Sequence, residues 1–183
     1  KVAAWEPWNE GNAGNFGAHT IDELCAHQKA AWLGFKAGDP EVVVGWNPLG
    51  GSNIKPLADG VLANETWPYY DTYNIHSYDW PHDYERLWAY ARKAACGRPI
   101  WVTECDRGLH ASPDSPWGDF THEDAVRKAE LITQSYVSSL AAGAQRHFHF
   151  ILGHYTEGDG AVQFGLLRKD LTPRPSYVAL AAL

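Results

Sequence analysis

Short apolar segments alternate with helical patterns along all 183 residues of the chain. The apolar segments are rich in β-branched and aromatic residues, which is typical of strands. The five expected strands are residues 2–5, 41–46, 70–76, 99–104 and 144–152. The expected helices are residues 20–37, 54–64, 82–95, 121–142 and a last one from about residue 174. Strands that are apolar on both faces and alternate with helices form a parallel sheet, so the sequence predicts an α/β fold in one domain.

The first expected helix has the clearest boundaries. Thr20 and Glu23 have the spacing of a capping box, in which each side chain bonds the backbone N–H of the other residue. Gly38 and Pro40 follow the last helical position and end the helix.

Composition argues against two classes of partner. The net charge of −7 disfavours a nucleic-acid surface, because phosphate binding needs clustered Lys and Arg. No apolar run approaches the ~18–20 residues that a membrane-spanning helix needs. The three cysteines are an odd number without a C-x-x-C pair, so no disulfide framework is indicated. We therefore expect neither a nucleic-acid nor a membrane partner.

Two expected strands lead to a glutamate. Glu10 closes the segment that follows the first strand, and Glu104 ends the fourth. In a parallel α/β array, reactive groups gather at the carboxyl ends of the strands, so these two residues can meet. A single glutamate in this position is more often a solvated loop residue or a helix cap. Asn-Glu after a tryptophan, together with Thr-Glu after a Pro-led strand, is rarer by chance, and two such carboxylates are typical of a glycosidase.

The other strand ends also carry polar or aromatic side chains. Trp46, His76 and the residues near His154 fall at the ends of the second, third and fifth strands. Aromatic rings stack on sugar rings but also fill cores, and both interpretations stay open for Trp46, Trp80 and Trp117. For His76, a structural histidine is an equal alternative. The expected substrate-binding residues are Trp8, Asn9, Trp46, Asn47, His76, Tyr78, Trp80 and His154.

The order of these motifs resembles the second part of the clan A glycoside hydrolases, which are retaining enzymes on a (β/α)8 barrel. Trp8-Asn9-Glu10 resembles the motif that closes the clan's fourth strand, and Ile75-His76-Ser77-Tyr78 the motif at its sixth. Thr103-Glu104 resembles the nucleophile motif at the seventh. Phe164-Gly165-Leu166-Leu167 and Thr172-Pro173-Arg174-Pro175-Ser176-Tyr177 resemble the segment after the eighth. Families 39 and 5 are the most similar, and the motifs do not separate them.

The resemblance implies that residues 1–183 are the C-terminal portion of one catalytic (β/α)8 domain and supply its fourth to eighth βα units. It implies that Glu10 is the acid/base and Glu104 the nucleophile, at a separation of about 5–5.5 Å. Asn9 would bind the sugar 2-hydroxyl, and Tyr78 would orient Glu104. The substrate would be a β-linked polysaccharide or its oligosaccharides, hydrolysed without a cofactor. A secreted or periplasmic location is favoured over a cytoplasmic one.

The stretch from 147 to 154 departs from the clan's pattern. The clan often carries a tryptophan at the end of the eighth strand, whereas this sequence reads His147-Phe148-His149-Phe150-Ile151-Leu152-Gly153-His154. A sugar platform there is in doubt, and His154 is a candidate to take part instead. His147 and His149 share one face of a strand, but no third ligand is evident and we expect no metal.

The first three strand–helix units of the barrel, and the arginine that usually supports the nucleophile, have no counterpart before Lys1. Five parallel strands alone would leave open sheet edges and the lumen-facing side chains of Ala4 and Val43 without a partner layer. We therefore expect the missing N-terminal half of the barrel, or another chain, to pair with residues 2–5. A non-catalytic carbohydrate-binding remnant and a transglycosylase on the same site are alternative functions.

Overall fold

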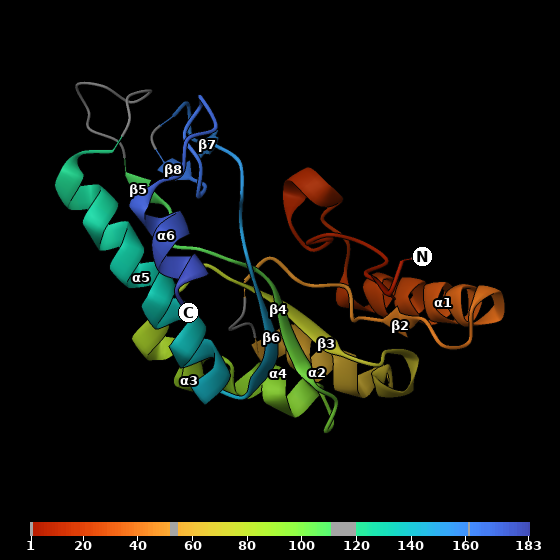
Figure 1. The fold of residues 1–183 in the computed structure, drawn as a ribbon. Helices are drawn as coiled ribbons and strands as arrows, with labels where there is room; N and C mark the ends of the chain where they lie inside the picture. Colours follow the sequence, from red (N-terminus) through yellow and green to blue (C-terminus); the bar gives the residue numbers. More distant parts are fainter. Residues whose placement is uncertain (1, 52–54, 111–119, 161) are drawn as a thin grey trace.

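Five strands run parallel in the computed structural model, which describes residues 2–51, 55–110, 120–160 and 162–183. The strands are β1 (Ala4–Trp5), β2 (Val43–Val44), β3 (Tyr73–Ser77), β4 (Ile100–Cys105) and β6 (Ala144–His149). β1 pairs with β2, β3 with β4, and β4 with β6, while a parallel bridge between Gly45 and Thr72 joins the two sets. Their spatial order follows the chain order (Figure 1), which confirms the expected α/β class with parallel strands.

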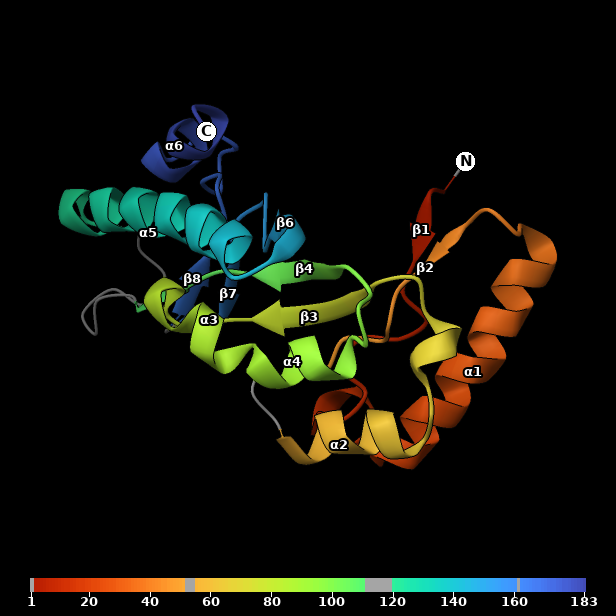
Figure 2. The ribbon, with the colours of Figure 1, turned by 90° about the horizontal axis from the view of Figure 1, so that it is seen from below.

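Helices connect these strands. They are α1 (Ile21–Gly38), α2 (Lys55–Ala63), α3 (Tyr84–Leu87), α4 (Ala89–Ala94), α5 (His122–Ala141) and α6 (Pro175–Ala181). Single turns of 3-10 helix occur as η1 (Gly14–Phe16), η2 (Trp67–Tyr69) and η3 (Pro81–Asp83). Figure 2 shows α2 and α4 along one side of β3 and β4, with α5 next to β6. Within the described ranges, no helix has the length and apolar character needed to span a membrane.

Helix α1 begins as its sequence predicts. The Thr20 hydroxyl accepts a hydrogen bond from the Glu23 N–H (3.3 Å), and the Glu23 carboxylate accepts one from the Thr20 N–H (2.8 Å). The helix ends at Gly38, before Pro40. The capping box is therefore confirmed, because it depends only on residues that are close in the sequence.

A buried glutamine on α1 fixes the chain where β2 ends. Gln28 is completely buried, and its amide N–H groups donate to the carbonyls of Gly45 (3.0 Å) and Tyr69 (2.9 Å). Its amide oxygen accepts from the Asn47 N–H (2.9 Å). One side chain thus satisfies three backbone groups. Each of these groups would cost about 1–3 kcal/mol if it were buried without a hydrogen-bond partner.

Aromatic side chains fill the core between the strands and the helices. Trp46 stacks on Tyr73 with ring centroids 6.0 Å apart, and Tyr84 stacks on Trp88 at 4.5 Å. Both tryptophans are completely buried. The large number of tryptophans and tyrosines is therefore explained in part by core packing.

The helix expected at 82–95 is divided into η3, α3 and α4. The chain leaves helical geometry at Trp88, which has φ −83° and ψ 7°. The buried Trp88 ring stacks on Tyr84 and donates its indole N–H to the Ser77 hydroxyl (3.1 Å). These tertiary contacts override the helical pattern of the sequence.

An antiparallel sheet that the sequence analysis did not expect lies beyond the parallel strands. β8 (Val162–Phe164) pairs with β7 (Tyr155–Glu157) and with β5 (Leu109–His110). The chain between β7 and β8 has positive φ at Gly158, Asp159 and Gly160, which a tight turn of this kind requires. The hairpin stands above the carboxyl end of β4 (Figure 1).

The face of the sheet opposite the helices carries large side chains. Trp101 alternates with the buried Ile100 and Val102, so it points to this other face. There it contacts the ring of Phe148 (6.3 Å) and lies under the guanidinium of Arg146 (5.0 Å). Phe148 is 46% exposed, so the aromatic rings on this face are only partly covered by the described residues.

Candidate active site

The loop after β2 fixes the backbone of Glu10. The Glu10 N–H donates to the Pro48 carbonyl (2.9 Å), and the Glu10 carbonyl accepts from the Ala13 N–H (2.7 Å). Glu10 has a φ of 45°, in the left-handed region that residues other than glycine rarely adopt. The two backbone bonds hold this conformation, so the side chain leaves the loop in a fixed direction.

The pairing of β3 with β4 brings a histidine next to the second glutamate. The parallel register sets His76 opposite Glu104, after a shift between Ile75 and His76. A shift of this kind is a bulge, and a bulge changes the direction of the side chains that follow it. The two strand ends therefore point a histidine and a carboxylate at the same place.

His76 lies between the two carboxylates. Its Nδ1 is 2.7 Å from Oε1 of Glu10 and 3.4 Å from Oε2 of Glu104. These three side-chain atoms all lie within 4.8 Å of one another. The Tyr78 hydroxyl donates to Oε2 of Glu104 (2.7 Å). The structure thus brings together four of the residues singled out in the sequence, from three different strand ends.

The surroundings of Glu104 act on its pKa in both directions. Burial raises the pKa of Glu104 above its ordinary value and is the largest effect, while His76 and the hydroxyl of Tyr78 lower it. The negative charge of Glu10 raises the pKa of Glu104 further. Burial also raises the pKa of the Tyr78 hydroxyl, which keeps its proton and remains a donor to Glu104.

The carboxylates open into a cleft of about 780 Å³. Of the residues expected from the sequence, Asn9, Glu10, Tyr78 and Glu104 line it. The cleft also contains residues that the sequence analysis missed, among them Phe16, Arg107, Phe150, Tyr155 and Glu157. The sequence offered one signal for the last two, since the alternating segments around Gly158-Asp159-Gly160 are typical of a hairpin.

Two expected substrate-binding residues lie in the core instead. Trp46 and Asn47 are completely buried, and neither lines the cleft. The Trp46 ring stacks on Tyr73, and the Asn47 N–H is bonded to Gln28. The prediction that Trp46 and Asn47 contact sugar is therefore wrong for this structure. The chain turns inward at the end of β2, where Gln28 anchors it.

Four other expected residues lie outside the lining of the cleft. One is His76, which is almost completely buried and contacts both carboxylates from its buried position. Trp8 is 45% exposed, but its indole N–H donates to the Phe16 carbonyl (3.0 Å) and its ring packs against His27 of α1. Trp80 lies under the guanidinium of Arg107 at 4.5 Å. Nδ1 of His154 is 3.4 Å from an Arg174 nitrogen. The prediction for Trp117 falls outside the described residues.

Among the described residues, the one group of three side chains close enough to share a metal ion is Glu10, His76 and Glu104. Two carboxylates and an imidazole are a reasonable donor set for a divalent ion. His147 and His149 do face the same side of β6, where His147 packs against Tyr136 (4.1 Å) and His149 approaches Asp106 (3.7 Å). No third ligand joins these two histidines in the part of the chain that the structure describes.

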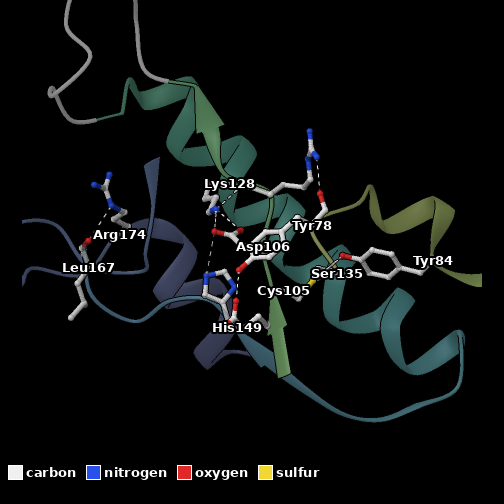
Figure 3. A network of polar contacts seen from close by, with 11 residues as sticks. Tyr78, Tyr84, Cys105, Asp106, Lys128, Ser135, His149, Leu167 and Arg174 are labelled. Atoms are coloured by element: carbon white, nitrogen blue, oxygen red, sulfur yellow. Dashed lines mark hydrogen bonds and ion pairs between the residues drawn. The ribbon is translucent and has the colours of Figure 1, made fainter. Parts of the chain in front are cut away.

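A buried ion pair lies directly beyond Glu104. Lys128, on α5, points its ammonium group at both oxygens of Asp106 and donates to the Arg107 carbonyl (2.8 Å) (Figure 3). Both charged side chains are almost completely buried. Burial raises the pKa of Asp106 to about 6 and lowers that of Lys128, and each partner opposes the shift of the other.

The same turn ties β4 to β3. The guanidinium of Arg107 donates to the Tyr78 carbonyl (2.7 Å), and the Tyr78 hydroxyl in turn donates to Glu104. On the other side of the strand, Cys105 and Ser135 share hydrogen-bond contacts with the Tyr84 hydroxyl (3.0 and 2.9 Å) (Figure 3). Glu104 is therefore held between two polar networks that fix the strand around it.

Solved structures resemble this chain, although no protein-family model and no curated protein sequence matches it. A glucosidase from Croceicoccus marinus superposes with a TM-score of 0.72 at 17% identity, covering 97% of this chain and 39% of that one. An α-L-arabinofuranosidase from Thermotoga maritima has a TM-score of 0.68 at 16% identity, covering 98% of this chain and 39% of that one. A β-glucuronidase from Bacteroides uniformis has a TM-score of 0.66 at 12% identity, covering 94% of this chain and 22% of that one.

These similarities establish the fold. The matched proteins are TIM-barrel glycoside hydrolases, and the described chain has the architecture of part of such a barrel. The chain spans about two fifths of the length of the first two structures and less of the third. The expected partial barrel is thus supported at the level of the fold.

The buried pair beneath the cleft can be tested by substitution. Lys128→Met leaves the Asp106 carboxylate buried without its partner, which lowers the free energy of unfolding by about 3–5 kcal/mol near neutral pH. The pKa of Asp106 is raised to about 6 by burial, and loss of Lys128, which lowers it, raises this pKa further. At pH values between the ordinary pKa of an aspartate and this raised one, the native variant keeps a proton that the unfolded chain has lost. Stability of the variant therefore falls as the pH rises through this window. Urea denaturation at about pH 5 and pH 7.5 measures the difference.

Two further variants complete this test. Adding Asp106→Asn to Lys128→Met recovers more than half of the loss, because the unpaired charge is gone. Lys93→Met is the control, because Lys93 pairs with Asp59 at 3.4 Å on the exposed surface. Removing this pair lowers the free energy of unfolding by about 1 kcal/mol or less. A Lys128→Met loss as small as that of the control contradicts the interpretation.

Proposed function

We propose that this chain carries the catalytic carboxylates of a retaining glycoside hydrolase that cleaves β-glycosidic bonds. The observation that carries the proposal is that one carboxylate oxygen of Glu10 and one of Glu104 lie within 4.8 Å of each other in one cleft. Retaining enzymes need the two carboxyl groups about 5–5.5 Å apart, whereas inverting enzymes need about 6.5–9.5 Å to fit a water molecule. The observed separation favours the retaining mechanism, and the shared fold of known glycosidases adds support.

The proposed reaction has two displacements. Glu104 attacks the anomeric carbon, and Glu10 gives its proton to the glycosidic oxygen as the bond to the leaving sugar breaks. The product is a glycosyl ester of Glu104. Glu10 then takes a proton from water, whose oxygen attacks the anomeric carbon and releases the sugar from Glu104. Both carboxyl groups end in their starting protonation states.

The environment of Glu104 bears on which carboxylate plays which role. Burial raises the pKa of Glu104, and taken alone this favours an acid. The Tyr78 hydroxyl opposes it, because a donor at 2.7 Å stabilises the ionised form that a nucleophile needs. The Tyr78 hydroxyl bonds only Oε2 of Glu104, so the other carboxylate oxygen can attack the anomeric carbon. Asn9, which lines the cleft beside Glu10, is the proposed partner of the sugar 2-hydroxyl.

Paired substitutions separate the two roles. Glu104→Gln removes the nucleophile and lowers kcat for every glycoside by about 10³-fold or more. Glu10→Gln slows natural substrates by about 10²–10⁴-fold but spares the first step for aryl glycosides with good leaving groups, which need little protonation. Steady-state and burst kinetics on dinitrophenyl glycosides and on oligosaccharides provide the measurement.

Glu41→Gln, a change at an exposed loop carboxylate, is the control and keeps wild-type kinetics. Equal losses on activated and natural substrates in both variants would contradict the role assignment. Saccharide binding without any hydrolysis would favour the non-catalytic remnant instead. Transfer of the sugar to an added saccharide in preference to water would identify a transglycosylase.

The Tyr78–Glu104 hydrogen bond predicts a shift in the pH profile. Tyr78→Phe removes a donor that lowers the pKa of Glu104, so this pKa rises further. Because Glu104 must be ionised to attack, the acidic limb of kcat/KM moves to higher pH in the variant. Tyr84→Phe is the control, since its hydroxyl contacts Cys105 and Ser135 and not Glu104. It lowers stability without moving the limb, and an equal shift in both variants would refute the assignment.

We also propose that further βα units pair with β1 and cover the open face of the sheet. Support comes from Trp5 of β1, which is 44% exposed although it stacks on Phe35 of α1, from Phe148 on the open face at 46%, and from the length of the matched structures. Exposed apolar area costs about 25 cal/mol per Å², so several such side chains amount to several kcal/mol. Sedimentation velocity of the isolated 183-residue chain should show self-association. A stable, folded monomer would count against this proposal.

A further inference from the structure

Two partly exposed aromatic rings line the same cleft as the carboxylates. Phe16 is 37% exposed and Tyr155 is 41% exposed. Phe16 belongs to η1, in the loop that follows Glu10, and Tyr155 belongs to the β7–β8 hairpin. Figure 1 shows the coil that contains η1 (red) and the hairpin (blue) as two separate segments of the chain. The rings therefore enter the cleft from different parts of the chain.

The Phe16 ring is on a fixed support next to Glu10. Its N–H donates to the Ala13 carbonyl (3.0 Å), and Ala13 is itself bonded to the Glu10 carbonyl. The Phe16 carbonyl accepts the indole N–H of Trp8 (3.0 Å). Phe16 thus moves with the segment that positions Glu10, and the exposed Trp8 has a role as its support.

Tyr155 is held on the side of Glu104. Its ring packs at right angles to Phe150 (5.4 Å) and against Phe164 (6.0 Å), its partner in the β7–β8 register. Burial raises the pKa of its hydroxyl, and the nearby Glu157 and Glu104 charges raise it further. The influence of Glu104 places Tyr155 within electrostatic reach of this carboxylate. The rings beneath fix its orientation before any ligand arrives.

The polar residues of the cleft indicate what kind of ligand the rings meet. Asn9, Arg107 and Glu157 line the cleft together with the two carboxylates. A lipid chain would leave these polar and charged groups without partners, at a cost of several kcal/mol. A sugar ring has apolar C–H faces and an edge of hydroxyl groups, so it satisfies both kinds of side chain.

We propose that Phe16 and Tyr155 stack on two different rings of one oligosaccharide, which lies across the cleft over Glu10 and Glu104. The inference rests on the proposed function and deepens it, because the substrate becomes a chain of several sugars and not a small glycoside. Phe16 meets the ring that leaves with the proton from Glu10. Tyr155 meets the part of the chain that Glu104 retains. The Tyr155 ring is already held by Phe150 and Phe164, so binding there loses little side-chain freedom.

Calorimetric binding of β-linked saccharides to the 183-residue Glu104→Gln chain tests this inference without turnover. The probes are glucose, xylose and mannose with cellotriose, xylotriose and mannotriose. One trisaccharide should bind at least about 10-fold more tightly than its monosaccharide. Phe16→Ala and Tyr155→Ala should each weaken this binding by about 10-fold and together by about 100-fold, because the sites are separate. Tyr177→Ala is the control, since Tyr177 is also 41% exposed but lies on α6.

The outcomes separate this inference from the proposed function. Ring-dependent trisaccharide binding without hydrolysis by the wild-type chain would support the inference and count against the enzyme. Hydrolysis of oligosaccharides with an unchanged KM in Phe16→Ala and Tyr155→Ala would overturn the inference and leave the enzyme standing. Failure of every trisaccharide to bind more tightly than its monosaccharide would also overturn it. Circular dichroism of each variant verifies that the fold is retained.

Discussion

The parallel pairing of β3 with β4 is the constraint on which the site depends. It sets His76 beside Glu104, and from there His76 reaches Glu10 on the loop after β1. Side chains alternate between the two faces of a strand, so a slip of one residue would turn Glu104 toward the helices. The bulge after Ile75 makes the register specific to one alignment. The distance between the carboxylates therefore depends on this register together with the loop contacts that hold Glu10.

Buried polar contacts keep this geometry in place on both sides of β4. Lys128 neutralises Asp106 at the end of the strand, and Tyr84 binds Cys105 one residue earlier. A buried ion pair contributes little net stability compared with apolar packing, but either partner alone is costly. Such a pair makes alternative arrangements of the strand end expensive. The network in Figure 3 thus acts on specificity of structure more than on overall stability.

The sequence was sufficient where local rules decide the outcome. Thr20 and Glu23 predicted the start of α1, and the strand-end rule predicted that Glu10 and Glu104 would share a cleft. It failed where tertiary packing decides. Trp46 looked like a sugar platform because it ends a strand, but only the position of Tyr73 and Gln28 determines that it turns inward. Phe16 and Tyr155 were missed because their exposure depends on how two loops fold over the sheet.

The Gln28 contacts have a consequence for how such a fold can change during evolution or engineering. Strand–helix units look like interchangeable modules, each with its own apolar stripe. Gln28 donates twice and accepts once, at backbone groups of residues 45, 47 and 69. A transplanted helix with equal shape but a hydrocarbon there would pack well and still leave three main-chain groups unsatisfied. Exchange of α1 is therefore limited by one amide at one position, and a recombined barrel would have to inherit helix and loops together.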